Sequence, residues 1–175
     1  MKGKRHAIRQ ARKLLSQMGI DAEKADVTKT KSNAINVESI AKELGITIVY
    51  EPFASDNISG VFLRKNKDLF LGVNKTHHPL RQRFTIAHEI GHYILHASDE
   101  LHYDTDNIET LHFRKADITS FDEIEANQFA AELLMPEGIL NRCIEGGIKA
   151  ISDLADRFSV SEDAMRYRLI NLGWL

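Results

Sequence analysis

Two histidines and a glutamate form the part of this sequence best suited to metal chemistry. His88, Glu89 and His92 stand in the pentapeptide HEIGH, an H-E-x-x-H motif. On an α-helix, residues four apart are rotated by about 40° and separated by about 6 Å along the axis, so both imidazoles project from one face. This spacing suits a single ion, and zinc is the metal expected at a hydrolytic site with neutral imidazole ligands. Glu89 lies on a neighbouring face, where its carboxylate can hydrogen-bond a metal-bound water.

A catalytic zinc needs a third protein ligand, and a later acidic segment offers two candidates. Glu123 and Asn127 are four residues apart, so a helix places both on one face, and alanines keep that face thin. One carboxylate can bind the metal while the amide orients a ligand histidine. Glu125 is rotated by about 200° from Glu123 and cannot share the role. The helical face favours Glu123, and Glu125 stays the alternative.

Several other residues near the motif have possible roles. His96 lies one turn after His92, and orienting a ligand or ending the helix is favoured over binding the metal. Tyr93 is a candidate for stabilising an oxyanion. Gly91, inside the helix, indicates that another backbone or a substrate approaches closely there. With Glu89 accepting a proton from the zinc-bound water and passing it to a leaving amine, the group predicts a metallopeptidase.

Hydrophobic periodicity predicts the elements that position these residues. Helices are expected over about 4–18, 37–45, 79–96, 122–135, 137–145, 151–158 and 161–173, and strands over 46–53, 58–64 and 69–74. The last two strands flank a polar turn and predict an antiparallel hairpin. We therefore expect an α+β fold, in which a small antiparallel three-stranded sheet packs against a mainly helical core. The strand over 69–74 is expected to offer an open edge to an extended peptide, and residues 97–121 a long loop that forms a lid or rim.

Length and composition indicate one domain with a small appendage. Residues 1–35 are expected to form a basic helix and a linker, and residues 36–175 the main domain, with 137–175 as a helical part packed on its core. The chain of 175 residues has 23 basic and 25 acidic side chains, so general attraction to nucleic acid is not expected. It has no apolar run long enough to span a bilayer. Cys143 is the single cysteine, which excludes an intrachain disulfide and favours the cytoplasm.

The C-terminal segment LADRFSVSEDAMRYRL has the spacing of a helix-turn-helix. Arg166 and Arg168 would lie on its second helix. Nearby acidic residues weaken any basic face, which argues against direct DNA binding.

Two of these segments resemble the ImmA/IrrE family of zinc metallopeptidase-like proteins. They are RFTIAHEIGHYILH (83–96) and EIEANQFAAELLMP (123–136), and the likeness covers roughly residues 36–173. The resemblance implies a compact core related to the thermolysin-like zincins. It also implies that His88, His92 and Glu123 bind zinc and that Glu89 is the general base.

The resemblance further implies a biological setting, because family members are bacterial or phage-borne and several act as anti-repressors. The expected function is a zinc-dependent endopeptidase of narrow specificity that cleaves a regulatory protein, with a helix-turn-helix repressor as the expected substrate. The alternative is a non-proteolytic anti-repressor or toxin–antitoxin component that binds a regulator and uses zinc mainly for structure.

Overall fold

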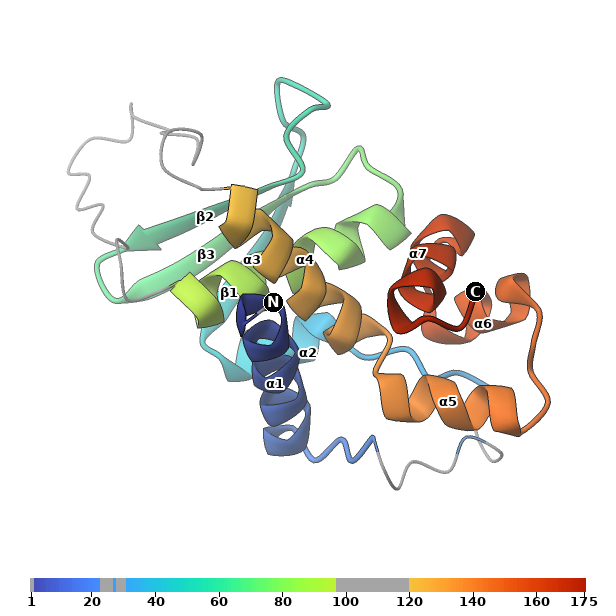
Figure 1. Cartoon of the computed structure of the whole chain (residues 1–175). Coiled ribbons are helices and arrows are strands. Elements are labelled where there is room, and N and C mark those ends of the chain that lie inside the picture. Colours follow the sequence, from blue (N-terminus) through green and yellow to red (C-terminus); the bar gives the residue numbers. More distant parts are fainter. Residues whose placement is uncertain (1, 23–26, 28–30, 97–119) are drawn as a thin grey trace.

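The chain folds into a small sheet and a larger set of helices, and the computed structural model describes residues 2–22, 27, 31–96 and 120–175. The helices are α1 (Lys2–Gln17), α2 (Val37–Glu43), α3 (Pro79–His96), α4 (Ser120–Leu134), α5 (Glu137–Glu145), α6 (Ile151–Phe158) and α7 (Glu162–Leu172). The strands are β1 (Ile46–Glu51), β2 (Gly60–Lys65) and β3 (Asp68–Asn74). Figure 1 shows the sheet on one side of α3 and α4, with α5, α6 and α7 gathered on the other. The predicted α+β, mainly helical fold is confirmed. Of the predicted loop over 97–121, residues 97–119 lie outside the described residues.

The sheet is mixed, which corrects the expectation of an antiparallel sheet. β2 runs antiparallel to β3, with Val61 opposite Gly72, as the hairpin predicts. β1 instead runs parallel to β3, with Ile48 opposite Leu71. β3 takes the central position, where its apolar side chains are buried; these are Leu69, Leu71 and Val73. Among the described strands, the order β1-β3-β2 therefore places β1 and β2 at the edges of the sheet, and β3, for which an open edge is predicted, at its centre.

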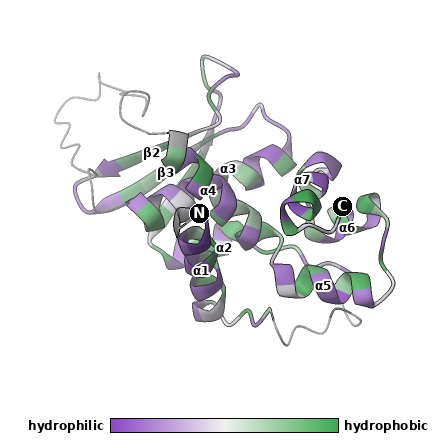
Figure 2. Cartoon of the chain, viewed as in Figure 1, coloured by the Kyte–Doolittle hydropathy of each residue, from purple (hydrophilic) through white to green (hydrophobic). Residues whose placement is uncertain are grey.

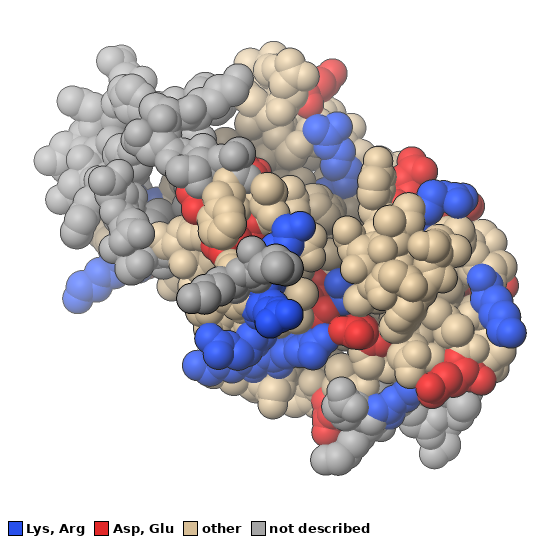
Figure 3. Space-filling view, in the orientation of Figure 1, with Lys and Arg blue, Asp and Glu red and all other residues tan. Residues whose placement is uncertain are grey.

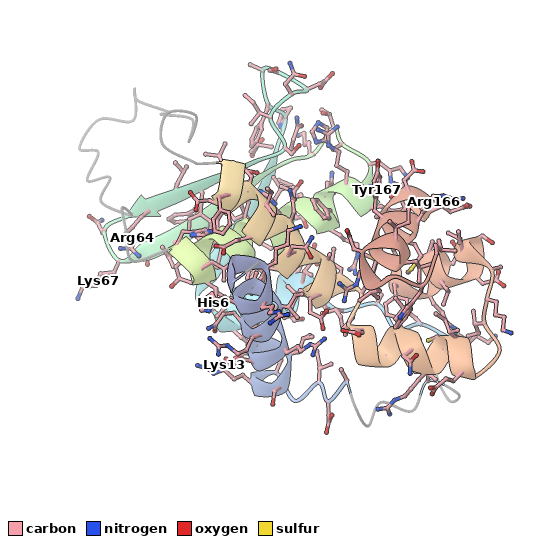
Figure 4. All side chains as sticks on the ribbon, viewed as in Figure 1. His6, Lys13, Arg64, Lys67, Arg166 and Tyr167 are labelled. Atoms are coloured by element: carbon pink, nitrogen blue, oxygen red, sulfur yellow. The ribbon has the colours of Figure 1, made fainter. Side chains whose placement is uncertain are left out.

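Helix α1 has one buried apolar stripe and one basic face. The stripe packs against α4 and α3 and consists of Ala7, Ala11, Leu14 and Leu15. Figure 2 shows the outer side of α1 as hydrophilic, and Figure 3 shows Lys and Arg side chains gathered over it. His6 and Lys13 point away from the body of the protein in Figure 4. Among the described residues, no helix is both long enough and apolar enough to cross a membrane.

Helices α3 and α4 approach each other at backbone distance. A Cβ placed on Gly91 would lie 3.3 Å from both the Cα and the carbonyl oxygen of Ala126, and 3.1 Å from Cδ1 of Phe129. Small residues at the crossing point remove the side chains that would otherwise hold the two backbones apart. The prediction that Gly91 marks a close approach is confirmed, and the approaching group is the backbone of α4.

The buried carboxylate of Glu132 connects α4 with α1, near the N-terminus, and with α7, near the C-terminus. The side chain of Glu132, on α4, is 2% exposed and bonds Nη2 of Arg168, which is also 2% exposed. Nε of Arg12, on α1, donates to the other Glu132 oxygen at 2.7 Å, and Nε of Arg168 donates to the Met135 carbonyl at 3.1 Å. Nη2 of the half-exposed Arg12 also donates to Oε2 of Glu137 on α5 at 2.6 Å, so α1, α4, α5 and α7 share the network.

The two arginines of the C-terminal helix-turn-helix pattern lie in different surroundings. Arg168 points inward from α7 to Glu132, while Arg166 and Tyr167 point outward (Figure 4). An arginine held by a buried carboxylate has no reach to a DNA groove. The second helix of the helix-turn-helix pattern therefore exposes one of the two arginines that suggested DNA contact.

Replacing Gly91 with leucine should lower the free energy of unfolding by about 1–3 kcal/mol, because the larger side chain must displace the backbone of α4. Urea denaturation measures the change. Ser16→Leu puts the same side chain on the exposed face of α1 and should shift stability by less than about 0.5 kcal/mol. Equal stability of Gly91→Leu and wild type would contradict the close contact.

Arg168→Met should destabilise the protein by about 3–5 kcal/mol, because it leaves the buried carboxylate of Glu132 with one cation. The matched control is Arg166→Met, two residues earlier on the same helix and exposed, with an expected change of about 0.5 kcal/mol or less. Thermal or urea unfolding of the two variants side by side tests the difference. A similar loss of stability in Arg168→Met and Arg166→Met would show that the ion-pair network contributes little to the free energy of unfolding.

Candidate active site

The two central helices bring the predicted metal ligands together. α3 carries His88 and His92 on one face, and their Nε2 atoms lie 3.0 Å apart. Glu123, in the first turn of α4, places one carboxylate oxygen 3.4 Å from Nε2 of His88 and the other 3.2 Å from Nε2 of His92. The His92 side chain is 4% exposed and that of Glu123 is 43% exposed, so the group is buried on the histidine side and opens to solvent at the carboxylate.

The two candidate glutamates of α4 lie in different surroundings. Glu123 faces His88 and His92, whereas Glu125 is buried and faces His96 and α1. Their separation follows from the helical rotation between positions two apart. In the structure, the carboxylate beside the HEIGH histidines is therefore that of Glu123, which the helical-face argument favours.

Asn127 contacts the far side of His88. Its Oδ1 lies 3.0 Å from Nδ1 of His88, and an amide oxygen can only accept a hydrogen bond. Nδ1 of His88 must then carry the proton, which leaves Nε2 as a lone-pair donor pointing toward Glu123 and His92. Phe84, one turn earlier on α3, stacks on the His88 ring with the centroids 6.1 Å apart. Both contacts fix the orientation of this imidazole.

Glu89 lies where the first residue of β2 meets α3. A Cβ on Gly60 would fall 2.6 Å from Cγ2 of Thr85 and 3.5 Å from Oε1 of Glu89. The absence of a side chain at Gly60 therefore lets the edge strand start directly beside the Glu89 carboxylate. Sequence reasoning did not single out Gly60, because a glycine at the start of a strand carries no local signal for a helix that follows later in the chain.

The remaining predicted residues lie apart from the three ligand atoms. Tyr93 stacks on Phe62 of β2 with the ring centroids 5.5 Å apart, so its described contact is with the sheet, and its oxyanion role stays a prediction. The His96 ring lies 5.7 Å from that of His92 and faces Asp122 and Glu125. Asp122 was not among the predicted residues. Asp122 and Glu125 are three residues apart, which puts both on one face of a helix. This spacing was the signal in the sequence that could have identified Asp122.

The donor set fits a divalent metal ion. The ligand atoms of His88, His92 and Glu123 all lie within 4.8 Å of one another. Ligands of a tetrahedral ion with bonds of about 2.0–2.1 Å lie about 3.3 Å apart, close to the separations of 3.0–3.4 Å found here. Two imidazoles and one carboxylate are a set that zinc accepts with a position left open.

Comparison with known proteins supports a peptidase family. Residues 41–170 match the Peptidase_M78 model, described as the IrrE N-terminal-like domain. The chain is 36% identical over 100 residues to the radiation response metalloprotease IrrE of Deinococcus radiodurans, an alignment that covers 55% of this chain and 29% of that protein. A solved structure titled Mycobacterium tuberculosis transcriptional regulator shares the fold with a TM-score of 0.59 and 18% identity, over 94% of this chain and 46% of that chain.

The matched part of this chain thus covers less than a third of the length of IrrE and less than half of the mycobacterial chain. The matched region contains all of β1, β2 and β3 and both helices that carry the candidate site. The HEIGH helix, the glutamate of α4 and the match over 41–170 agree, and the chain belongs to the Peptidase_M78 family of IrrE N-terminal-like domains.

Proposed function

We propose that this chain is a zinc-dependent endopeptidase that hydrolyses a peptide bond in a specific regulatory protein, with a helix-turn-helix repressor as the expected substrate. The observation that carries the proposal is the convergence of His88 and His92 with Glu123, beside Glu89 on the same helix. Family membership supports the metallopeptidase activity. The ImmA/IrrE resemblance supports a regulatory protein as substrate.

Each site residue has a role that its surroundings support. His88, His92 and Glu123 hold the metal, which when bound supplies Lewis acidity to the attacking water and the scissile carbonyl. Glu89 accepts the proton of that water and delivers it to the leaving amine. Asn127 keeps Nδ1 of His88 protonated, so that Nε2 stays available as a ligand.

We propose that the substrate backbone binds along the edge of β2. β2 begins beside the Glu89 carboxylate and lies outside β3 in the sheet. An extended peptide that pairs with an open strand edge gains main-chain hydrogen bonds without needing a particular sequence. A peptide paired there would run past the general base.

The reducing cytoplasm is the proposed location of the reaction, because Cys143 is buried and unpaired. We take residues 36–175 as the metallopeptidase unit, and the family match over 41–170 supports this division.

Glu89→Gln should abolish cleavage while leaving the metal ligands intact, because glutamine cannot accept the proton. A helix-turn-helix repressor from the same genome is incubated with zinc-loaded wild type or variant, and intact mass is recorded. Two complementary fragments are expected with wild type, at a rate at least about 10²-fold above that of the variant. Glu162→Gln, exposed at the start of α7, is the control and should cleave normally.

A repressor that stays whole but loses its operator with both wild type and Glu89→Gln would contradict the peptidase proposal. That outcome would instead support the binding-effector alternative. Metal content of each preparation, measured in parallel, separates loss of the base from loss of the ion.

Asn127→Ala should weaken zinc binding about 10–100-fold, because His88 loses the acceptor that holds its Nδ1 proton in place. A competition titration with a chromogenic chelator measures the affinity. Asn127→Asp keeps a hydrogen-bond acceptor at the same position and should restore the zinc affinity. Asn141→Ala, which removes an exposed amide bonded to Glu145 on α5, is the matched control. Unchanged affinity in Asn127→Ala would remove Asn127 from the proposed site.

A further inference from the structure

A second group of metal-binding side chains lies where α3 ends and α4 begins. His96 is the last residue of α3, and Asp122 and Glu125 lie in the first two turns of α4. One nitrogen of His96 and one oxygen from each carboxylate lie within 4.8 Å of one another. None of these residues belongs to the group formed by His88, His92 and Glu123.

The distances within this group are too long for hydrogen bonds. Nδ1 of His96 is 3.7 Å from Oδ1 of Asp122, and Nε2 is 3.8 Å from Oε2 of Glu125. Hydrogen bonds from nitrogen to oxygen span about 2.7–3.2 Å. Nε2 of His96 is buried and has no hydrogen-bond partner among the described residues. Two ligands of one ion with bonds of about 2.1 Å lie about 3.0–3.6 Å apart. One ion binds one nitrogen of His96, and the three donor atoms, which lie within 4.8 Å of one another, must close by about an ångström around it.

Glu125 gives an independent reason to expect a cation. The residue is 8% exposed, and its contact with His96 is the one polar interaction found for it in the described part of the chain. Its Oε1 lies against α1, where a Cβ on Gly3 would come within 1.8 Å of it. A largely buried carboxylate is stabilised when a charge of opposite sign is bound to it. Oε2 of Glu125 lies 3.8 Å from Nε2 of His96, the buried nitrogen that has no hydrogen-bond partner among the described residues.

The charges of the three side chains match a divalent ion. Two carboxylates and one neutral imidazole neutralise a charge of +2, which is the condition for burying a cation at low cost. One nitrogen and two oxygens are donors that Zn²⁺ and Mn²⁺ both accept. The competing explanation, a protonated His96 between two carboxylates, needs no metal and is separated from it by the experiment below.

We propose that His96, Asp122 and Glu125 form a second divalent-cation site, adjacent to the His88, His92 and Glu123 group and independent of it. An ion there joins the C-terminus of α3 to the N-terminal turns of α4 at the point where α1 covers both. The site depends on its own donor atoms and does not require that the chain be a peptidase.

Zinc stoichiometry tests the proposal directly. Metal-free protein is dialysed against buffered Zn²⁺, and bound zinc per chain is measured by mass spectrometry of the element. Wild type should hold two equivalents. Glu125→Gln should hold one, His88→Ala should hold one, and the double variant should hold none. Glu162→Gln, an exposed glutamate on α7, is the matched control and should keep both equivalents.

Two further measurements keep the test decisive. Circular dichroism of each variant checks folding, and Asp122→Asn, at a partly exposed position, repeats the loss of one equivalent without changing a buried residue. Thermal unfolding of His88→Ala should shift upward on adding Zn²⁺ and should not shift in the double variant. One equivalent in wild type with none in His88→Ala would overturn the proposal, as would a second equivalent that survives both Glu125→Gln and Asp122→Asn.

Discussion

The backbone contact between α3 and α4 is the constraint on which the candidate site depends. Gly91 lies against Ala126, so the two helix axes come close enough for short side chains to meet across them. His92 follows Gly91 directly, and Glu123 lies one turn before Ala126, which is why their ligand atoms come within 3.2 Å. A glycine inside a helix costs about 1 kcal/mol relative to alanine. Here that cost accompanies a contact so close that even a Cβ at position 91 would lie 3.1–3.3 Å from atoms of α4.

The position of α4 is determined from several sides at once. α3 packs against one side of it, while Glu132 pairs with the buried Arg168 of α7 and with the half-exposed Arg12 of α1. Ion pairs in a buried setting are costly to break, because removing one partner leaves a desolvated charge. The rotation of α4 about its own axis is therefore held by charged contacts as well as by packing. That rotation decides that Glu123 faces the HEIGH histidines and Glu125 faces His96.

Local patterns predicted most of the elements, and the errors concern contacts between them. Pro79 and the apolar spacing that follows indicate α3 with the bounds that the structure shows. The prediction that β1 is antiparallel to its neighbour was wrong, because β1 runs parallel to β3. Pairing between strands separated along the chain has no local signal. The burial of Arg168 against Glu132 has no local signal either. An arginine on an amphipathic helix looks the same in sequence whether it faces solvent or a buried carboxylate such as Glu132.

The sequence by itself determined the α+β class, the helix that carries HEIGH and the pairing of His88 with His92 on one face. These properties depend on backbone periodicity, which residues within a few positions of one another control. Only the tertiary structure decided which of the described strands lies at the centre of the sheet, which glutamate lies beside the histidines and that His96 faces Glu125. Those outcomes depend on how elements far apart in the chain bury their side chains against one another, and no local spacing encodes that choice.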